Sequence, residues 1–280
     1  MAEFGGDFVG YLPSILVLMF TGAVAGLLAG LLGVGGGIVI VPVLFNMFGV
    51  LHLPPEWAMH VAVATSLATI IPTSIVSMRA HWKKGNVDVD LLKVWAVWAF
   101  VGATIGTILA GQFKSWMLTA IFAVVASLVA INMASRDGLK VADTLPVSKV
   151  KNAIMSFFIG GFSVTMGIGG GTLSVPTLSA FNFPIHRAVG TAAALGLPIA
   201  IPGVIGFAIA GWGVENRPPL SIGFINIVGF LLIFPLSSLM APYGAAIAHK
   251  LNRVWLRRAF ALFLGVTAVR MFLRLYEVFA

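Results

Sequence analysis

A glycine-rich motif that occurs twice constrains this chain more than any other feature. Residues 33–42 read GVGGGIVIVP and residues 167–176 read GIGGGTLSVP, an offset of 134 positions. From Gly33 to Leu44, seven of twelve positions are identical in the second copy. Four glycines in five residues predict an interruption in any helix, because each costs about 1 kcal/mol relative to Ala. Apolar residues continue on both sides, which is typical of a broken or re-entrant membrane helix, and a matching pair points to a transporter's binding site.

The composition of the chain indicates a membrane protein. Of the 280 residues, 59% are hydrophobic and 9% are charged, whereas a soluble domain has about 25% charged residues. The apolar runs are about 20 residues long, enough to cross about 30 Å of hydrocarbon. We therefore predict an all-α polytopic membrane protein with no separate catalytic domain. The sequence contains no cysteine, which excludes disulfides and thiolate metal sites.

The repeated motif divides the chain into two halves of about five segments each. We predict a first transmembrane repeat at 1–135, a cytoplasmic linker at 136–151 and a second repeat at 152–280, together forming one membrane domain. The segments 38–50 and 172–181 are too short to span a bilayer at about 1.5 Å per residue. Whether they cross or turn back is open at this stage.

The basic residues predict how the two halves are oriented. Most of the net charge of +8 lies in short loops, which is typical of cytoplasmic loops and does not indicate nucleic-acid binding. In the first half the basic loop follows the third segment, at 79–84, whereas in the second half it is the next loop, at 250–258. This exchange predicts two inverted repeats. Both termini are then expected outside, with loops 79–90 and 136–151 in the cytoplasm.

The glycine interruptions are the predicted binding site. A helix that begins inside hydrocarbon leaves its first N–H groups without partners, and its dipole adds positive potential there. Nearby hydroxyls can donate further hydrogen bonds, so the site suits a small anion. The candidate substrate-binding residues are Gly35, Gly36, Gly37, Thr65, Ser66, Gly169, Gly170, Gly171, Thr172 and Thr191, with Ser174 nearby. The alternative is that the glycines only permit close helix crossing and the hydroxyls bond within or between helices.

Charged residues limit the mechanism. All nine Asp and Glu residues lie in loops or at the termini, so the spans hold no carboxylate relay of the kind that proton and cation pathways use. His60 lies within a span and either titrates near neutral pH or bonds to a neighbour. A basic group at the cytoplasmic end of the third segment could steer anions inward or could only set topology; it comprises Arg79, His81, Lys83 and Lys84. We expect no catalytic residues, no metal site and no cofactor.

Taken together, these motifs resemble the TauE/SafE family, the sulfite exporters. The likeness rests on the repeated G-x-G-G-G-x-x-x-x-P, on Thr65-Ser66 and Gly190-Thr191 after the two copies, and on RAHWKKGNVD at 79–88. It implies a permease of the bacterial inner membrane that exports sulfite, sulfoacetate or related organosulfonates. This chain has Ala64 where glycine is commoner in the family, and its second copy lacks the serine that follows Thr65.

Other functions stay open at this stage. An importer or uniport channel for other small organic anions fits the same features, and so does a membrane scaffold that transports nothing. A membrane-embedded enzyme is disfavoured, because cysteine is absent and no carboxylate lies within a span. The expected partners are a small anionic substrate and membrane lipid, and the chain could be a monomer or a homodimer.

Overall fold

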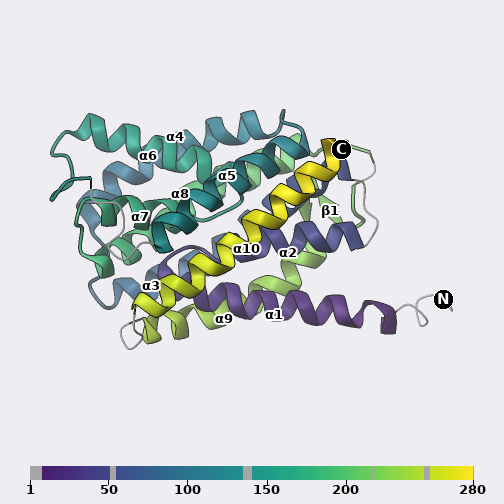
Figure 1. Ribbon diagram of the computed structural model, residues 1–280, viewed down its shortest axis with the longest axis horizontal. Helices are drawn as coiled ribbons and strands as arrows, with labels where there is room; N and C mark the ends of the chain where they lie inside the picture. Colours follow the sequence, from purple (N-terminus) through teal and green to yellow (C-terminus); the bar gives the residue numbers. More distant parts are fainter. Residues whose placement is uncertain (1–7, 51–54, 135–140, 216, 249–252, 280) are drawn as a thin grey trace.

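The computed structural model describes residues 8–50, 55–134, 141–215, 217–248 and 253–279 (Figure 1). Predictions about the N-terminal residues 1–7 and about 136–140 of the linker lie outside the described residues. Within the described ranges the chain forms ten helices and one short hairpin. They are α1 (Phe8–Leu32), α2 (Gly37–Val50), α3 (Pro55–Trp82), α4 (Val89–Ala110), α5 (Ser115–Ala134), α6 (Lys149–Thr165), α7 (Gly171–Ala180), α8 (Ile185–Ala210), β1 (Ser221–Ile222), β2 (Ile225–Asn226), α9 (Ile227–Ile247) and α10 (Arg253–Phe279).

Six of the described helices are long and apolar enough to cross a bilayer: α1, α3, α4, α5, α8 and α9. The helices α2 and α7 have 14 and 10 residues, or about 21 and 15 Å at the helical rise. The structure is therefore that of a multi-pass, essentially all-α membrane protein, as the composition predicts.

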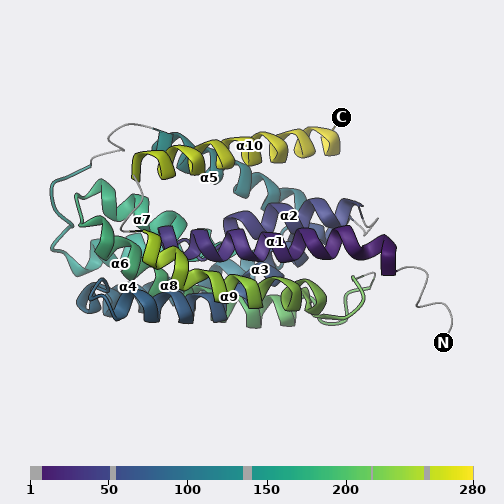
Figure 2. The same ribbon diagram turned by 90° about the horizontal axis from the view of Figure 1, so that it is seen from below.

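The helices of the two halves pack on one another in matching pairs. The first helix of each half packs on the fourth helix of the other, so α1 lies against α9 and α6 lies against α4. The helix α3 packs on α8, and α5 packs on α10. Figure 2 shows α5 and α10 together on one face of the bundle.

Small residues allow these helices to approach closely. A Cβ atom added at Gly22, Gly26 or Gly30 of α1 would collide with the backbone of α9. The same holds between α4 and α6, where added Cβ atoms at Gly102 and Gly160 would collide with the facing backbone. The glycines that recur along α1 therefore serve internal packing, in the manner of other membrane helices.

The two short helices double back along the helices that precede them. The helix α2 lies beside α1 and α7 lies beside α6, so the chain reverses at each glycine segment (Figure 2). As a result α1 begins and α10 ends at the same end of the bundle, whereas α3 ends at the opposite end (Figure 1). The chain therefore reverses direction before each of the short segments 38–50 and 172–181.

Candidate functional site

The two glycine segments, Gly33–Gly37 and Gly167–Gly171, lie in contact with each other in the interior. Each one connects the end of one helix to the start of a short one, and all ten residues are buried. A Cβ atom added at Gly35 would lie 2.9 Å from Cα of Gly169, and one added at Gly169 would lie 3.0 Å from Cα of Gly35. The backbones at the centres of the two segments therefore touch.

The contact is reciprocal on either side of this central pair. A Cβ atom at Gly37 would overlap the carbonyl oxygen of Gly167, and one at Gly171 would overlap the carbonyl oxygen of Gly33. Gly36 also has a φ of 76°, which a residue with a side chain adopts only with strain. Glycine is thus required by close approach at some of these positions and by backbone conformation at others.

Backbone donors in both segments are left without acceptors. The N–H groups of Gly35, Gly36 and Gly37, and those of Gly169, Gly170 and Gly171, make no hydrogen bond to another described residue. More than about 90% of buried backbone N–H groups in proteins are paired. Six unpaired donors therefore lie together in two touching segments, at the positions predicted to bind the anion.

The candidate hydroxyls on α3 and α8, those of Thr65, Ser66 and Thr191, make contacts with other segments. Ser66 donates to the carbonyl oxygen of Gly167 over 2.7 Å, which ties α3 to the second glycine segment. Thr65 accepts from the backbone N–H of Asn226 at the start of α9, and Thr191 accepts from that of Asp88 at the start of α4, both over 2.9 Å. The structure therefore brings Ser66 to the glycine segments and uses Thr65 and Thr191 to anchor the starts of α9 and α4.

Three hydroxyls near the second glycine segment are buried without a hydrogen-bond partner among the described residues. Thr172 and Ser174 in the first turn of α7 are buried, and neither hydroxyl has a hydrogen-bond partner among the described residues. Ser163, one turn before the second segment on α6, is also fully buried and unpaired. The sequence reading missed Ser163, although a serine four residues before Gly167 in an apolar run is a usable signal.

The four predicted steering residues do not act as one exposed group. Arg79, Lys83 and Lys84 are exposed, whereas His81 is buried with Nε2 3.0 Å from the carbonyl oxygen of Gly30. Lys84 donates from Nζ to the carbonyl oxygen of Ala245 over 2.9 Å. His81 and Lys84 therefore hold the end of α3 against α1 and α9, and attraction of anions by this loop stays a prediction.

Sequence reasoning also missed an ion pair at the same end of the bundle. Asp88 caps α4 by accepting from the N–H of Leu91, and Arg187 at the start of α8 donates to its other carboxylate oxygen over 2.7 Å. Arg187 lies 99 positions along the chain from Asp88. No sequence pattern connects two residues so far apart, so this contact depends on the fold.

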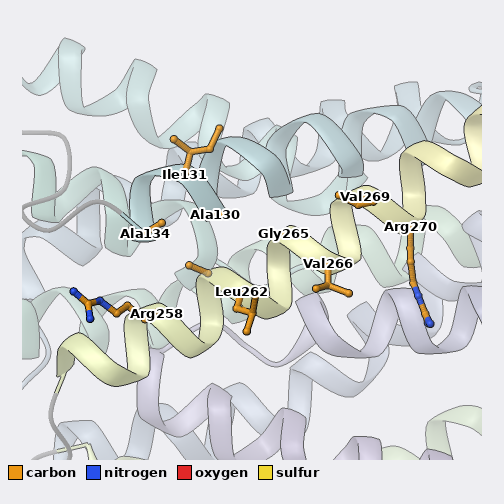
Figure 3. Close-up of a pocket in the computed structure, with 10 residues that line it drawn as sticks. Ala130, Ile131, Ala134, Arg258, Leu262, Gly265, Val266, Val269 and Arg270 are labelled. Atoms are coloured by element: carbon orange, nitrogen blue, oxygen red, sulfur yellow. The ribbon is translucent and has the colours of Figure 1, made fainter.

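A groove of about 750 Å³ lies away from the glycine segments, between α5 and α10 (Figure 3). Its walls are apolar apart from Arg258 and Arg270, which lie toward its two ends. No residue of either glycine segment lines it. The groove is therefore a separate feature from the site formed by the glycine segments.

The fold is that of a multi-pass membrane protein, and comparison with known proteins shows its class to be the membrane transporters. The chain is 35% identical over 263 residues to a probable membrane transporter protein of Haemophilus influenzae, covering 93% of this chain and 98% of that one. It is 28% identical to the probable membrane transporter protein MJ0441 of Methanocaldococcus jannaschii, covering 94% and 97%. The probable membrane transporter protein YunE of Bacillus subtilis is 26% identical to this chain, and the match covers 85% of this chain and 90% of YunE.

The family is equally clear. Residues 18–271 match the family described as Sulfite exporter TauE/SafE, and the chain belongs to that family. The resemblance seen in the repeated glycine motif is thereby confirmed. No solved structure matches the chain.

Proposed function

We propose that this protein exports small sulfur-containing anions, such as sulfite, sulfoacetate or related organosulfonates, through the site where its glycine segments meet. The observation that carries the proposal is the contact between two buried segments that together leave six backbone N–H groups unpaired. The oxygens of a sulfite or sulfonate group are acceptors and complement such donors. Membership in the sulfite exporter family supports this substrate class.

Helix dipoles add to the donors. The helices α2 and α7 begin at Gly37 and Gly171, so the positive end of each points into the site. A partly buried helix terminus stabilises a neighbouring charge by up to about 2 kcal/mol. The hydroxyls of Thr172 and Ser174 would supply further donors to the anion's oxygens.

The proposal includes inverted repeats at 1–135 and 152–280, each with a glycine-broken, re-entrant helix. The reciprocal packing of α1 on α9 and of α6 on α4 supports this arrangement. The two reciprocal contacts between the glycine segments, of Gly171 with Gly33 and of Gly37 with Gly167, also support it. The termini would then lie outside the bacterial inner membrane, with loops 79–90 and 136–151 inside.

Export needs no buried carboxylate in this scheme. Because the cell interior is negative, each negative charge moved outward gains about 2.3 kcal/mol per 100 mV. Both glycine segments are buried in the described conformation. Helices around the central pair α3 and α8 must therefore move before substrate can reach the site.

Transport by the purified protein in liposomes tests the proposal. Vesicles loaded with sulfite, sulfoacetate, taurine, sulfate or acetate would be held at a fixed potential, and we expect efflux of sulfite or a sulfonate. Efflux of carboxylates alone would instead indicate a carrier of other organic anions. No flux of any of these anions would refute the proposed function.

A pair of glycine variants then tests the site. Gly35 and Gly213 have similar backbone conformations, with φ of 74° and 78°, but only Gly35 has neighbours within 4 Å of an added Cβ. Both variants carry the same backbone strain, but only Gly35→Ala places a methyl group against the second glycine segment. We therefore expect Gly35→Ala to abolish transport and Gly213→Ala to retain it. Equal transport by the two variants would remove the site assignment.

A further inference from the structure

The central helix α3 carries buried hydroxyls in only one of its halves. All of its serines and threonines lie at 65–82 and are buried, whereas 55–64 contains neither residue type. They are Thr65, Ser66, Thr69, Thr73, Ser74 and Ser77. The other half instead places His60 among three aromatic rings, those of Trp57, Phe207 and Phe224. The half of α3 that leads from the glycine segments to Trp82 is therefore the more polar one.

Ser74 differs from the other hydroxyls of this half. Each of the other five makes a hydrogen bond. Ser74 is 1% exposed, and its hydroxyl has no partner among the described residues. A Cβ atom added at Gly196 of α8 would overlap this hydroxyl, so the hydroxyl points across the interface between the two central helices. Buried polar groups are usually paired, and an unpaired donor in this place calls for a ligand.

The side chain of Ile70 separates Ser74 from the glycine segments. Its Cγ2 atom would lie 3.5 Å from a Cβ atom added at Gly35 and 3.6 Å from one added at Gly196. Ile70 is fully buried and lies on α3 one turn after Ser66, which donates to the second glycine segment, and one turn before Ser74. An apolar side chain at a constriction excludes water and hydrated ions. Ile70 is therefore placed to close a passage between the glycine segments and Ser74.

Both central helices contain a proline at this contact. Pro72 lies two residues before Ser74 in α3, and Pro198 lies two residues after Gly196 in α8. Proline lacks the N–H group that a helix interior uses, and helices kink where it occurs. The contact of Ser74 with Gly196 therefore lies at a bending point of both helices.

The segment that follows α3 closes this side of the central pair in the described conformation. The backbone N–H of Asp88 donates to Thr191, and its carboxylate accepts from Arg187 over 2.7 Å. A Cβ atom added at Gly190 would overlap the carbonyl oxygen of Asn86. The start of α8 is thus covered, and an anion reaches Ser74 only after this segment and the two helices move apart.

We propose that Ser74 is a second binding position for the anion and that Ile70 is the apolar gate between it and the glycine segments. The inference rests on the proposed function, whose topology places this end of α3 on the cytoplasmic side, where an exporter receives its substrate. When α3 and α8 bend apart at their prolines, the Ser74 hydroxyl donates to an oxygen of the sulfite or sulfonate group. The side chain of Ile70 then moves aside and admits the anion to the glycine segments.

Labelling of single cysteines tests the position of Ser74. The chain contains no cysteine, so Ser74→Cys has a single thiol. The probe is 2-sulfonatoethyl methanethiosulfonate, an anionic sulfonate that attaches to thiols, added to the protein in liposomes. We expect it to label Ser74→Cys and not Thr73→Cys, because the neighbouring Thr73 bonds to Ser237 of α9 instead of facing α8. Equal labelling of the two variants, or none of Ser74→Cys, would overturn the inference whether or not any anion is transported.

Transport by Ser74→Ala tests the use of the hydroxyl. We expect the flux of sulfite or sulfoacetate at low concentration to fall about tenfold, the effect of one lost hydrogen bond to a charged group. Thermal unfolding should be unchanged, because the hydroxyl has no partner to lose. Ser127→Ala on α5, whose hydroxyl donates to the carbonyl oxygen of Ala123, is the matched control and should keep the wild-type flux. Wild-type flux in Ser74→Ala would overturn the inference and leave the proposed function standing.

Substitutions of Ile70 test the gate. We expect Ile70→Phe to block transport but to leave Ser74→Cys open to the labelling reagent, because Ser74 lies on the outer side of the gate. Ile70→Ala has a smaller side chain and should raise the flux. Thermal unfolding identifies the variants that are folded. Loss of both labelling and transport in folded Ile70→Phe, or no rise in flux in folded Ile70→Ala, would overturn the assignment of Ile70 as the gate.

Discussion

The two glycine segments share a backbone arrangement but differ in the side chains around them. Position by position, Ile38 and Ile40 in α2 correspond to Thr172 and Ser174 in α7. The hydroxyls of Thr172 and Ser174 are buried and unpaired. Both glycine segments thus have unpaired backbone N–H donors, whereas the unpaired side-chain donors lie beside the second glycine segment. Under the proposed function, a bound anion would be held by both backbones and would lie closer to α7.

Valine at Gly37 or Gly171 gives the largest expected effect and tests the part of the comparison that is shared. Both side chains would collide with a backbone carbonyl, of Gly167 and Gly33 respectively. We expect each variant to lower the free energy of unfolding by about 3 kcal/mol, because backbone cannot move aside as a side chain can. Thermal unfolding in detergent measures this. Gly265→Val, at a position with no neighbour within 4 Å, is the control, and equal stability of all three variants would contradict the reciprocal contact.

Replacing Ser66 tests a contact that only one half makes. Ser66→Ala leaves the buried carbonyl oxygen of Gly167 without its donor, at an expected cost of about 2 kcal/mol of stability. In the other half of the comparison, Gly33 corresponds to Gly167 and Ala192 corresponds to Ser66. Ala192 has no hydroxyl, so it donates no side-chain hydrogen bond to the carbonyl oxygen of Gly33. Thermal unfolding of Ser66→Ala and of Ala192→Ser would compare the two sides. A neutral Ser66→Ala would show that the contact is dispensable.

Removal of the Thr172 hydroxyl sharpens the unequal part of the comparison. We expect Thr172→Val to raise the KM for the anion about tenfold while leaving the protein at least as stable, because the hydroxyl has no partner to lose. Thr177→Val on the same helix is the matched control, since its hydroxyl already donates to the carbonyl oxygen of Leu173. Concentration-dependent flux gives both KM values. The same KM in the two variants would exclude Thr172 from the site.

The smallest expected effect compares the two threonine anchors. Thr65→Val and Thr191→Val each remove the acceptor of one backbone N–H, at about 1 kcal/mol. The contact of Thr191 with Asp88 is supported by the ion pair to Arg187, which is half exposed and contributes at most about 1 kcal/mol. The contact between Thr191 and Asp88 is kept in Thr65→Val and lost in Thr191→Val. We therefore expect added salt to reduce the stability of Thr65→Val more than the stability of Thr191→Val. Denaturant unfolding at low and high salt measures the difference, and equal salt effects would assign the ion pair no part in the anchor.

Much of the helical layout could be read from the chain, because its causes are local. Glycine clusters end α1 at Leu32 and α6 at Thr165, since glycine disfavours helix wherever it occurs. The roles of individual hydroxyls could not be read in the same way. Thr65 and Thr172 have the same chemistry, yet one accepts from Asn226 and the other has no partner.

The sequence by itself determined that the chain is a multi-pass membrane protein of the TauE/SafE family with a duplicated glycine motif, because hydropathy, run length and local motifs do not depend on distant contacts. Only the tertiary structure decided that Gly35 meets Gly169, that α2 and α7 turn back, and that His60 is enclosed by aromatic rings. These features depend on which residues of distant segments come within a few ångströms of each other. Close packing of the helices sets that proximity, and the order of residues along the chain does not contain it.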